Sequence, residues 1–374
     1  MKIIIDENIP FIKGVFEPYA QVKYMAGESI SCYDVKDTDA LIIRTRTKCN
    51  ELLLKGSKVK YIASATIGYD HIDTKWCKAN KISWSNAAGC NAKSVGQYVL
   101  ASLLKIADQK NFDLTEKTIG IVGVGHVGSV VKQMAEILQM RVLLNDPPRE
   151  EKEGASQFVS LDTITNESDI ISLHTPLTYE NHFKTYHLFD NAFSQKLKTG
   201  VVIINTSRGE VIDENALKTA ILNNTIGATV IDVWENEPFI DSKLINLINI
   251  ATPHIAGYST DGKAKATEMT VQAISNFFAL PLNNWSVHVL PSPNNNKIYL
   301  NNPASSIQQA LQQIVPISYN IAEDDTNLRN NYKNFEYLRK TYRVRREFPY
   351  YSVSSNNYIN KIKTQLTLLG FNIS

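Results

Sequence analysis

The stretch Thr118–Met140, TIGIVGVGHVGSVVKQMAEILQM, decides the fold of this 374-residue chain. A β-branched run ends in Gly123-x-Gly125-x-x-Gly128, and a helical pattern follows directly. The first glycine permits a tight turn, the second lets a pyrophosphate approach the backbone, and the third allows close packing of helix against strand. The helix N-terminus also favours an anion. The stretch therefore predicts a dinucleotide-binding turn.

An acidic residue, Asp146, lies where a dinucleotide-binding turn requires a carboxylate, at the end of the following strand. The run Arg141–Asn145 predicts the next strand, and Asp146 follows it directly. A carboxylate there accepts both ribose hydroxyls and repels a 2′-phosphate, so we expect NAD rather than NADP. Arg149 could instead meet a 2′-phosphate, although an exposed arginine beside two prolines is commoner. The expected cofactor contacts in this region are Gly123, Gly125, His126, Val127, Gly128 and Asp146.

Strand-like runs alternate with helical patterns on both sides of this turn, which predicts parallel sheets covered by helices. After the turn they lie at Asp169–His174, Val201–Asn205, Thr229–Val233 and Ile248–Thr252, and before it at Lys2–Asp6, Ala40–Arg44 and Val59–Ser64. A helix over Val95–Lys110 could bridge the two α/β units. We expect an α/β fold with a Rossmann-type NAD-binding domain over 95–257 and a flavodoxin-like substrate-binding domain over 1–94 and 258–285.

The chain changes character after Ala279, where it becomes rich in asparagine and proline. Ser305–Ile314 and Ile359–Leu369 read as amphipathic helices. Aromatic residues interleaved with arginine are typical of interfaces. We therefore expect a C-terminal α+β domain over 286–374 that forms a homodimer, with Arg345 or Arg346 reaching the partner's active site. The aromatic residues in question are Tyr332, Phe335, Tyr337, Tyr342, Phe348, Tyr350 and Tyr351.

Polar segments follow the predicted strands, where open parallel sheets bind ligands. They are His174–Pro176, Asn205–Asp213, Asp232–Pro238 and the run TPHIAGYS from Thr252.

Oxidation of a secondary alcohol needs a base, a cation for a substrate carboxylate, and a group that supports the base. His254 is the candidate base, because imidazole titrates near neutral pH. The alternative for His254 is a core histidine bonded to the backbone. Glu237 would stabilise the imidazolium. Arg208 offers a planar fork that fits a carboxylate.

With these residues the sequence resembles the D-isomer-specific 2-hydroxyacid dehydrogenases, whose Arg/Glu/His trio matches Arg208, Glu237 and His254. The resemblance runs from residue 1 to about 280. It is most specific to the members that oxidise 4-phospho-D-erythronate at C2 to (R)-3-hydroxy-2-oxo-4-phosphooxybutanoate in vitamin B6 biosynthesis. The stretches that carry it are Asp6–Pro10, Arg44–Thr47, Thr66–Asp73, Gly89–Ala92, Asn145–Arg149, Pro253–Tyr258 and Leu338–Glu347.

The resemblance implies roles for further residues. Thr45, Thr66 and Tyr258 would contact the phosphorylated substrate, with support from Arg44. Thr175, Thr206, Ser207, Arg208, Asp232 and Gly257 would line NAD together with Asp146. This chain departs from the family pattern at Arg46, Ala88 and Gln97.

The overall composition excludes several other classes of protein. A net charge of +2 gives no field for nucleic acid or an anionic membrane. The four cysteines have no metal-ligand spacing, so we expect no metal site and buried reduced thiols. Asp6 and Glu7 interrupt the apolar start, and we expect a cytoplasmic protein.

Two other functions stay open on the sequence. The first is a 3-phosphoglycerate dehydrogenase, or a dehydrogenase of another D-2-hydroxyacid, with a regulatory tail. The second is an NAD-sensing, co-repressor-like binding protein whose basic residues near Arg345 meet nucleic acid. Glu323, Asp324 and Asp325 offset that basic charge. Turnover of a hydroxyacid would separate the enzymes from the binding protein.

Overall fold

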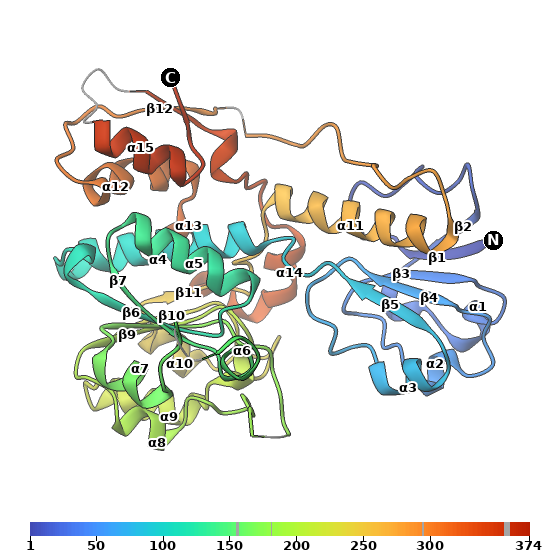
Figure 1. Cartoon of the computed structure of the whole chain (residues 1–374), viewed down its shortest axis with the longest axis horizontal. Helices are drawn as coiled ribbons and strands as arrows, with labels where there is room; N and C mark the ends of the chain where they lie inside the picture. The colour runs from blue at the N-terminus through green and yellow to red at the C-terminus, as the bar shows by residue number, and fades with distance from the viewer. Residues whose placement is uncertain (155–156, 181, 294, 355–359) are drawn as a thin grey trace. The chain divides into compact units, whose positions relative to one another are not determined.

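Figure 1 shows the computed structural model of the chain, which describes residues 1–154, 157–180, 182–293, 295–354 and 360–374. These residues form two compact units. The first contains residues 1–91 and 259–291, and the second contains residues 92–258 and 292–374. The predicted α/β fold is confirmed, because both units are built on parallel sheets.

The first unit has a five-stranded sheet in the order β2-β1-β3-β4-β5. Ile3 and Ile5 of β1 pack on one face of the sheet and Ile4 packs on the other, as the two-residue period of a strand requires. The long helix α11 covers the face of Ile3 and Ile5. The elements are β1 (Lys2–Asp6), β2 (Gln21–Met25), α1 (Cys32–Val35), β3 (Ala40–Ile43), α2 (Glu51–Leu54), β4 (Tyr61–Ser64), α3 (Thr74–Ala79), β5 (Ser83–Asn86) and α11 (Thr260–Phe278).

The sequence did not reveal the two outer strands of this sheet. β2 and β5 are the edge strands, and their side chains are exposed or only partly buried. Because an edge strand is half solvated, QVKYM and SWSN lack the apolar run that marks a central strand.

The second unit has a six-stranded parallel sheet in the order β11-β10-β9-β8-β6-β7. The strand order reverses between β6 and β8, and ligands bind at such a switch point in open α/β sheets. Its elements are α4 (Ala92–Lys110), β6 (Thr118–Val122), α5 (His126–Ile137), β7 (Arg141–Asn145), α6 (Pro147–Glu153), α7 (Leu161–Glu167), β8 (Ile170–Leu173), α8 (Asn191–Gln195), β9 (Val201–Asn205), α9 (Glu214–Leu222), β10 (Ile226–Ile231), α10 (Ser242–Leu247) and β11 (Ile250–Ala251).

The C-terminal segment belongs to the same unit and adds a three-stranded parallel sheet, β12-β13-β14. The predicted helices are present as α12 and α15, although residue 359 lies outside the described residues. The sequence missed α13, whose surface is rich in Asp and Asn. The elements are β12 (Lys297–Tyr299), α12 (Ile307–Ser318), α13 (Ile321–Asn331), α14 (Phe335–Lys340), β13 (Ser352–Ser354), α15 (Asn360–Leu368) and β14 (Asn372–Ile373).

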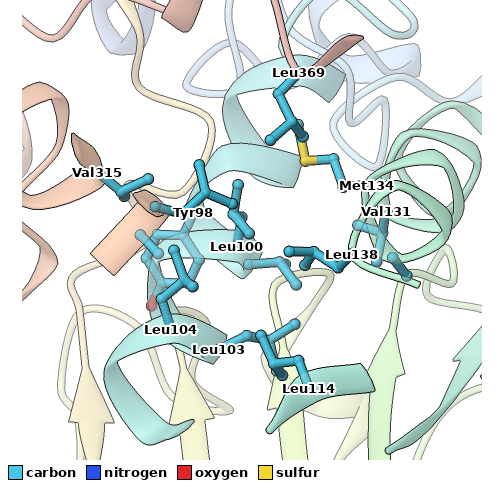
Figure 2. Packing of buried hydrophobic residues seen from close by; sticks show 14 of the residues in the cluster. Tyr98, Leu100, Leu103, Leu104, Leu114, Val131, Met134, Leu138, Val315 and Leu369 are labelled. Atoms are coloured by element: carbon cyan, nitrogen blue, oxygen red, sulfur yellow. The ribbon is translucent and has the colours of Figure 1, made fainter. Parts of the chain in front are cut away.

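The core of the C-terminal segment is continuous with the core around the six-stranded sheet. Figure 2 shows Val315 of α12 and Leu369 packed in one cluster with Tyr98 of α4 and Met134 of α5. Gln365 of α15 also donates a hydrogen bond to the carbonyl of Ile137 at the end of α5. The predicted division into three domains stays a prediction, but residues 292–374 share their apolar core with α4 and α5.

The cysteines are all free thiols, and their burial differs. Cys49 and Cys77 are buried, whereas Cys90 is partly buried and Cys32 is exposed. The expectation of buried thiols is therefore wrong for Cys32, which lies at the start of the short surface helix α1. Within the described ranges, no helix is both long and apolar enough to cross a membrane.

Candidate active site

The turn between β6 and α5 has the geometry that a dinucleotide requires. Gly123 has a φ of +86°, and a Cβ there would lie 2.7 Å from the carbonyl oxygen of His174. A Cβ on Gly128 would lie 2.1 Å from the carbonyl oxygen of Gly123, so only glycine fits. A Cβ on Gly125 would meet nothing within 4 Å. The space over Gly125 is therefore open, and Gly125, as the N-cap residue of α5, brings no side chain to cap the helix.

Asp146 closes this turn from the end of β7. One carboxylate oxygen accepts a hydrogen bond from the backbone N–H of Val124 at 2.7 Å, and the other accepts from the N–H of Arg149. The Arg149 side chain is paired with Glu153 on the same helix and also donates to the carbonyl of Val124. The Asp146 carboxylate and the Arg149 guanidinium therefore both contact the glycine turn or residues next to it.

The loop after β8 adds a polar atom that has no partner. The hydroxyl of Thr175 is buried, and no group in the described part of the chain bonds it. The neighbouring His174 lies between the hydroxyls of Ser172, at 2.8 Å, and Thr206, at 3.3 Å. Burial lowers the pKa of His174 to about 3, so this ring is neutral. The open space over Gly125, the Asp146 carboxylate and the unpaired Thr175 hydroxyl fit a bound dinucleotide.

Arg208 is held by a tight polar turn at the end of β9. The side chain of Asn205 accepts hydrogen bonds from the N–H and hydroxyl of Ser207 and donates one to the carbonyl of Arg208. A Cβ on the next residue, Gly209, would lie 2.0 Å from the backbone carbonyl of Trp234. This close approach brings the Arg208 turn against the segment that carries Glu237.

The structure brings Glu237 and His254 into direct contact. A Glu237 carboxylate oxygen lies 2.8 Å from Nδ1 of His254, and the other accepts a hydrogen bond from the N–H of Trp234. Burial alone would raise the pKa of Glu237, but the His254 ring and the hydrogen bonds hold that pKa below its ordinary value. Because a carboxylate takes the Nδ1 proton of the neutral ring as a hydrogen bond, the ring's lone pair is on Nε2.

The loop that carries His254 is organised by Asp232, at the end of β10. This buried carboxylate accepts hydrogen bonds from the hydroxyl of Thr252 and from the N–H groups of Ile255 and Ala256, at 2.6–2.9 Å. Burial raises the pKa of Asp232 above its ordinary value. His254 has a φ of +56°, in the left-handed region, and its N–H donates to the carbonyl of Asp232. The unusual backbone of His254 is thus fixed by neighbouring bonds.

The candidate substrate residues lie in both units. In the first unit, Arg44 and Thr45 follow β3 and Thr66 follows the adjacent strand β4, so they share one edge of that sheet. Arg44 is paired with the buried Asp6 at 3.1 Å, and the Thr66 hydroxyl lies 2.8 Å from that of Ser64. In the second unit, Gly257 and Tyr258 end the His254 loop.

Several residues that shape the site were missed by the sequence reasoning. The buried Trp234 donates from its indole N–H to the carbonyl of Thr252, and Tyr98 lies 2.6 Å from the Thr252 hydroxyl. Asn205, which builds the Arg208 turn, begins the predicted polar segment Asn205–Asp213, but the sequence reasoning gave it no role of its own. The signal for Asn205 and Trp234 was their place at the ends of buried strands, whereas Tyr98 has no local signal, because its partner is 154 residues away.

The expected role of Arg345 at a partner's active site is wrong for this structure. Arg345 is 2% exposed and bonds to its own chain through the carbonyls of Ser94 and Ala256. Other arginines of this segment are also paired within the chain, since Arg343 bonds Asp324 and Arg329 bonds Asp325. This pairing leaves less basic surface for the nucleic-acid alternative than the sequence alone suggested. Among the residues described, no cluster of His, Cys, Asp or Glu could hold a metal ion.

Comparisons with known proteins agree with this geometry. Residues 96–256 match the family model described as "D-isomer specific 2-hydroxyacid dehydrogenase, NAD binding domain", and residues 289–370 match a domain of unknown function, DUF3410. The chain is 50% identical to an erythronate-4-phosphate dehydrogenase of Bacteroides thetaiotaomicron, over 94% of this chain and 99% of that protein. It is 40% identical to the enzyme of the same name from Proteus mirabilis, over 100% of this chain and 99% of that protein.

Two solved structures show the same fold. One is the D-lactate dehydrogenase of Aquifex aeolicus complexed with NAD and lactic acid, with a TM-score of 0.64 and 27% identity, covering 78% of this chain and 100% of that one. The other is the NAD-bound 3-phosphoglycerate dehydrogenase of Entamoeba histolytica, with a TM-score of 0.63 and 28% identity, covering 78% of this chain and 99% of that one.

Proposed function

Because the chain belongs to the D-isomer-specific 2-hydroxyacid dehydrogenase family, we propose that it oxidises 4-phospho-D-erythronate at C2 with NAD, in vitamin B6 biosynthesis. The product is (R)-3-hydroxy-2-oxo-4-phosphooxybutanoate. The observation that carries the chemistry is the Glu237–His254 pair, which leaves the lone pair of the imidazole on Nε2. The phosphorylated substrate is supported by the relatives that share the name erythronate-4-phosphate dehydrogenase.

The reaction removes a proton from the C2 hydroxyl and a hydride from C2. When bound, NAD accepts the hydride. His254 takes the hydroxyl proton on Nε2, and the Glu237 carboxylate stabilises the imidazolium that results. Arg208 would bind the substrate carboxylate through its planar guanidinium and so orient C2. Arg44, Thr45, Thr66 and Tyr258 are proposed for the rest of the substrate.

The residues proposed to hold NAD are those at the carboxyl edge of the second unit's sheet. Asp146 would accept the ribose hydroxyls, and the N–H groups at the start of α5 would meet the pyrophosphate. Asp232 is proposed from the family resemblance to line NAD, and its carboxylate also holds the His254 loop. The remaining proposed contacts are Gly123, Gly125, His126, Val127, Gly128, Thr175, Thr206, Ser207, Arg208 and Gly257.

One assay tests the proposed substrate. Formation of NADH is measured with 4-phosphoerythronate, 3-phosphoglycerate, lactate and glycerate at matched concentrations. We expect the highest kcat/KM with 4-phosphoerythronate. A higher kcat/KM with 3-phosphoglycerate would instead assign the chain as a 3-phosphoglycerate dehydrogenase. NAD binding without turnover of any of the four would favour the co-repressor-like alternative.

We also propose that the protein is a homodimer formed through its C-terminal segment. The sequence argument for the interface is wrong for Phe335, Phe348 and Tyr351, because these rings are buried in the chain's own core. Support comes from apolar side chains that stay exposed on this segment, Ile317 and Tyr337 among them. Light scattering should give a dimer that becomes monomeric in Ile317→Glu/Tyr337→Glu. Leu222→Glu on α9 is the matched control, and a double variant that stays dimeric would place the interface elsewhere.

The proposed location is the cytoplasm. The four cysteines are free thiols, a state that the reducing cytoplasm maintains.

A further inference from the structure

Arg345, in the segment after α14, is a buried charged residue that bonds two backbone carbonyls. Its guanidinium donates from Nη1 to the carbonyl of Ala256 at 3.1 Å and from Nη2 to the carbonyl of Ser94 at 2.7 Å. The guanidinium carbon lies 3.7 Å from the centre of the Tyr319 ring. Only 2% of the residue is exposed. Both Nη groups are thus bonded, while Nε is buried without a partner among the described residues. Because a buried charge is costly unless it is hydrogen-bonded, the two carbonyl bonds hold this side chain in place.

One of these two carbonyls, that of Ala256, belongs to the loop that carries His254. Ala256 is fixed on both sides: its N–H donates to Asp232 at 2.9 Å, and its carbonyl accepts from Arg345 and from the hydroxyl of Ser94, the latter at 2.9 Å. His254 lies two residues earlier, with the left-handed φ of +56°. Such a backbone persists only where the surrounding structure over-determines it.

The nearest acidic influence on Arg345 comes from the same segment. Asp324 of α13 is buried, is paired directly with Arg343, and accepts a hydrogen bond from the Tyr342 hydroxyl at 2.8 Å; it also interacts electrostatically with Arg345. Lysine is a poor replacement for this arginine, because its ammonium is a compact point charge that lacks the planar arrangement of donors and does not stack flat on a ring. The buried position between the two carbonyls and the Tyr319 ring therefore fits a guanidinium best.

We propose that Arg345 is a positioning residue for the catalytic base: it holds the Ala256 peptide so that His254 keeps its place against Glu237. Asp232 secures the loop from the sheet side, and Arg345 secures it from the C-terminal segment. The inference rests on the proposed function, since it assigns His254 the role of base. It gives the residues that match the domain of unknown function a part in catalysis, in addition to the proposed dimer contact.

The first test is kinetic. Arg345→Met should lower kcat by about 10–100-fold, because a displacement of the base of about 1 Å has an effect of that size. The dissociation constant of NAD, followed by protein fluorescence, should stay nearly unchanged. Arg345→Lys should restore little of the rate, whereas added ethylguanidinium should restore part of it to Arg345→Ala. Arg141→Met is the matched control, since Arg141 is an exposed arginine of the same unit that pairs with Glu167 at the start of β7.

The second test separates positioning from a loss of stability. Leu366→Ala in α15 removes a fully buried side chain of the same core from an element other than the His254 loop, and it leaves the hydrogen bonds of Ala256 in place. Urea unfolding places the variants on one stability scale. A kcat loss in Leu366→Ala as large as that of an equally destabilised Arg345 variant would overturn the proposal. Ser94→Ala, which removes the other side-chain donor to Ala256, should give a smaller loss of kcat and stays usable if Arg345→Met fails to fold.

The third test needs no turnover. The ring signals of His254 are followed by NMR in the protein without substrate, and are assigned with His254→Ala. They should move or broaden in Arg345→Met and Ser94→Ala and stay in place in Arg141→Met. Unmoved signals in Arg345→Met would overturn the proposal even if the enzyme is active. If the signals move but 4-phosphoerythronate is not oxidised by the unmodified protein, the substrate assignment fails and the positioning role stands.

Discussion

Nδ1 of His254 and a carboxylate oxygen of Glu237 lie 2.8 Å apart, although the two residues leave the sheet on different strands, β11 and β10. The contact fixes the direction of the imidazole and places its lone pair on the far nitrogen, Nε2. It also puts an anion beside the ring that gains a positive charge during the reaction. Orientation and electrostatic support of the base therefore come from one hydrogen bond.

Replacing the base should stop the chemistry and spare the cofactor site. We expect His254→Ala to lower kcat by at least about 100-fold, the usual scale for a lost general base. Its affinity for NAD, measured by fluorescence titration, should be nearly unchanged, because the glycine turn lies after β6. His182→Ala is the control, since His182 is exposed and paired with Glu151. A His254→Ala variant that keeps most of its activity would exclude this residue as the base.

Removing the anion should change the pH profile. The pKa of Glu237 is held below its ordinary value, so the carboxylate is ionised at neutral pH. In Glu237→Gln the imidazolium loses its stabilising charge and gives up its proton at lower pH. The acidic limb of the kcat/KM profile should therefore move to lower pH, with a reduced maximum rate. Glu235→Gln, which alters the separate Glu235–His187 pair, should leave the limb in place; an unmoved limb in Glu237→Gln would contradict the pairing.

The same carboxylate should link stability to pH. A group whose pKa is depressed in the folded state stabilises the protein above its unfolded pKa and loses that effect as the pH falls through the folded value. The unmodified protein should therefore lose more stability than Glu237→Gln when urea unfolding is repeated from pH 7 down through the range below the ordinary glutamate pKa of 4.5. Parallel losses in the two proteins would show that the Glu237–His254 pair does not stabilise the fold.

Asp146 should set the choice of cofactor. Asp146→Ala should weaken NAD binding and reduce the preference for NAD over NADP. The substitution removes both the acceptor for the ribose hydroxyls and the charge that repels the 2′-phosphate of NADP. The carboxylate also accepts the Val124 N–H and caps α6, so Asp146→Asn, which keeps an acceptor, serves as the milder partner variant. Calorimetric titration with both nucleotides measures the preference. Equal affinities of the unmodified protein for NAD and NADP would refute the role of Asp146 in cofactor choice.

Two glycines of the turn should behave in opposite ways. In Gly125→Ala the new methyl group meets nothing, so urea unfolding should be unchanged. The methyl group would block the pyrophosphate, and a lost charge-assisted hydrogen bond of about 1.5–3 kcal/mol weakens NAD by about tenfold or more. In Gly128→Ala the Cβ would lie 2.1 Å from the Gly123 carbonyl, and overpacking should lower the free energy of unfolding by about 1–3 kcal/mol. Equal stability of the two variants would disprove this account of the turn.

The sequence by itself determined the features that short-range physics controls. Gly123, Gly125 and Gly128 predict their turn because only glycine allows its positive φ and its close approaches. The central strands are apparent from their continuous apolar runs, since both of their faces are buried. The identities of Arg208, Glu237 and His254 could be chosen because polar residues at strand ends gather at one edge of a parallel sheet.

Only the tertiary structure decided how these residues are held. Arg345 bonds Ser94 across 251 positions of sequence, and the Gly209 backbone packs on Trp234. Neither contact has a local pattern, because each depends on which elements pack together after the chain has folded. The same holds for the aromatic residues of the C-terminal segment: composition favours an interface, but Phe335 and Phe348 fill the chain's own core. Apolar side chains are buried wherever the fold places a complementary surface, and the sequence does not state where that surface lies.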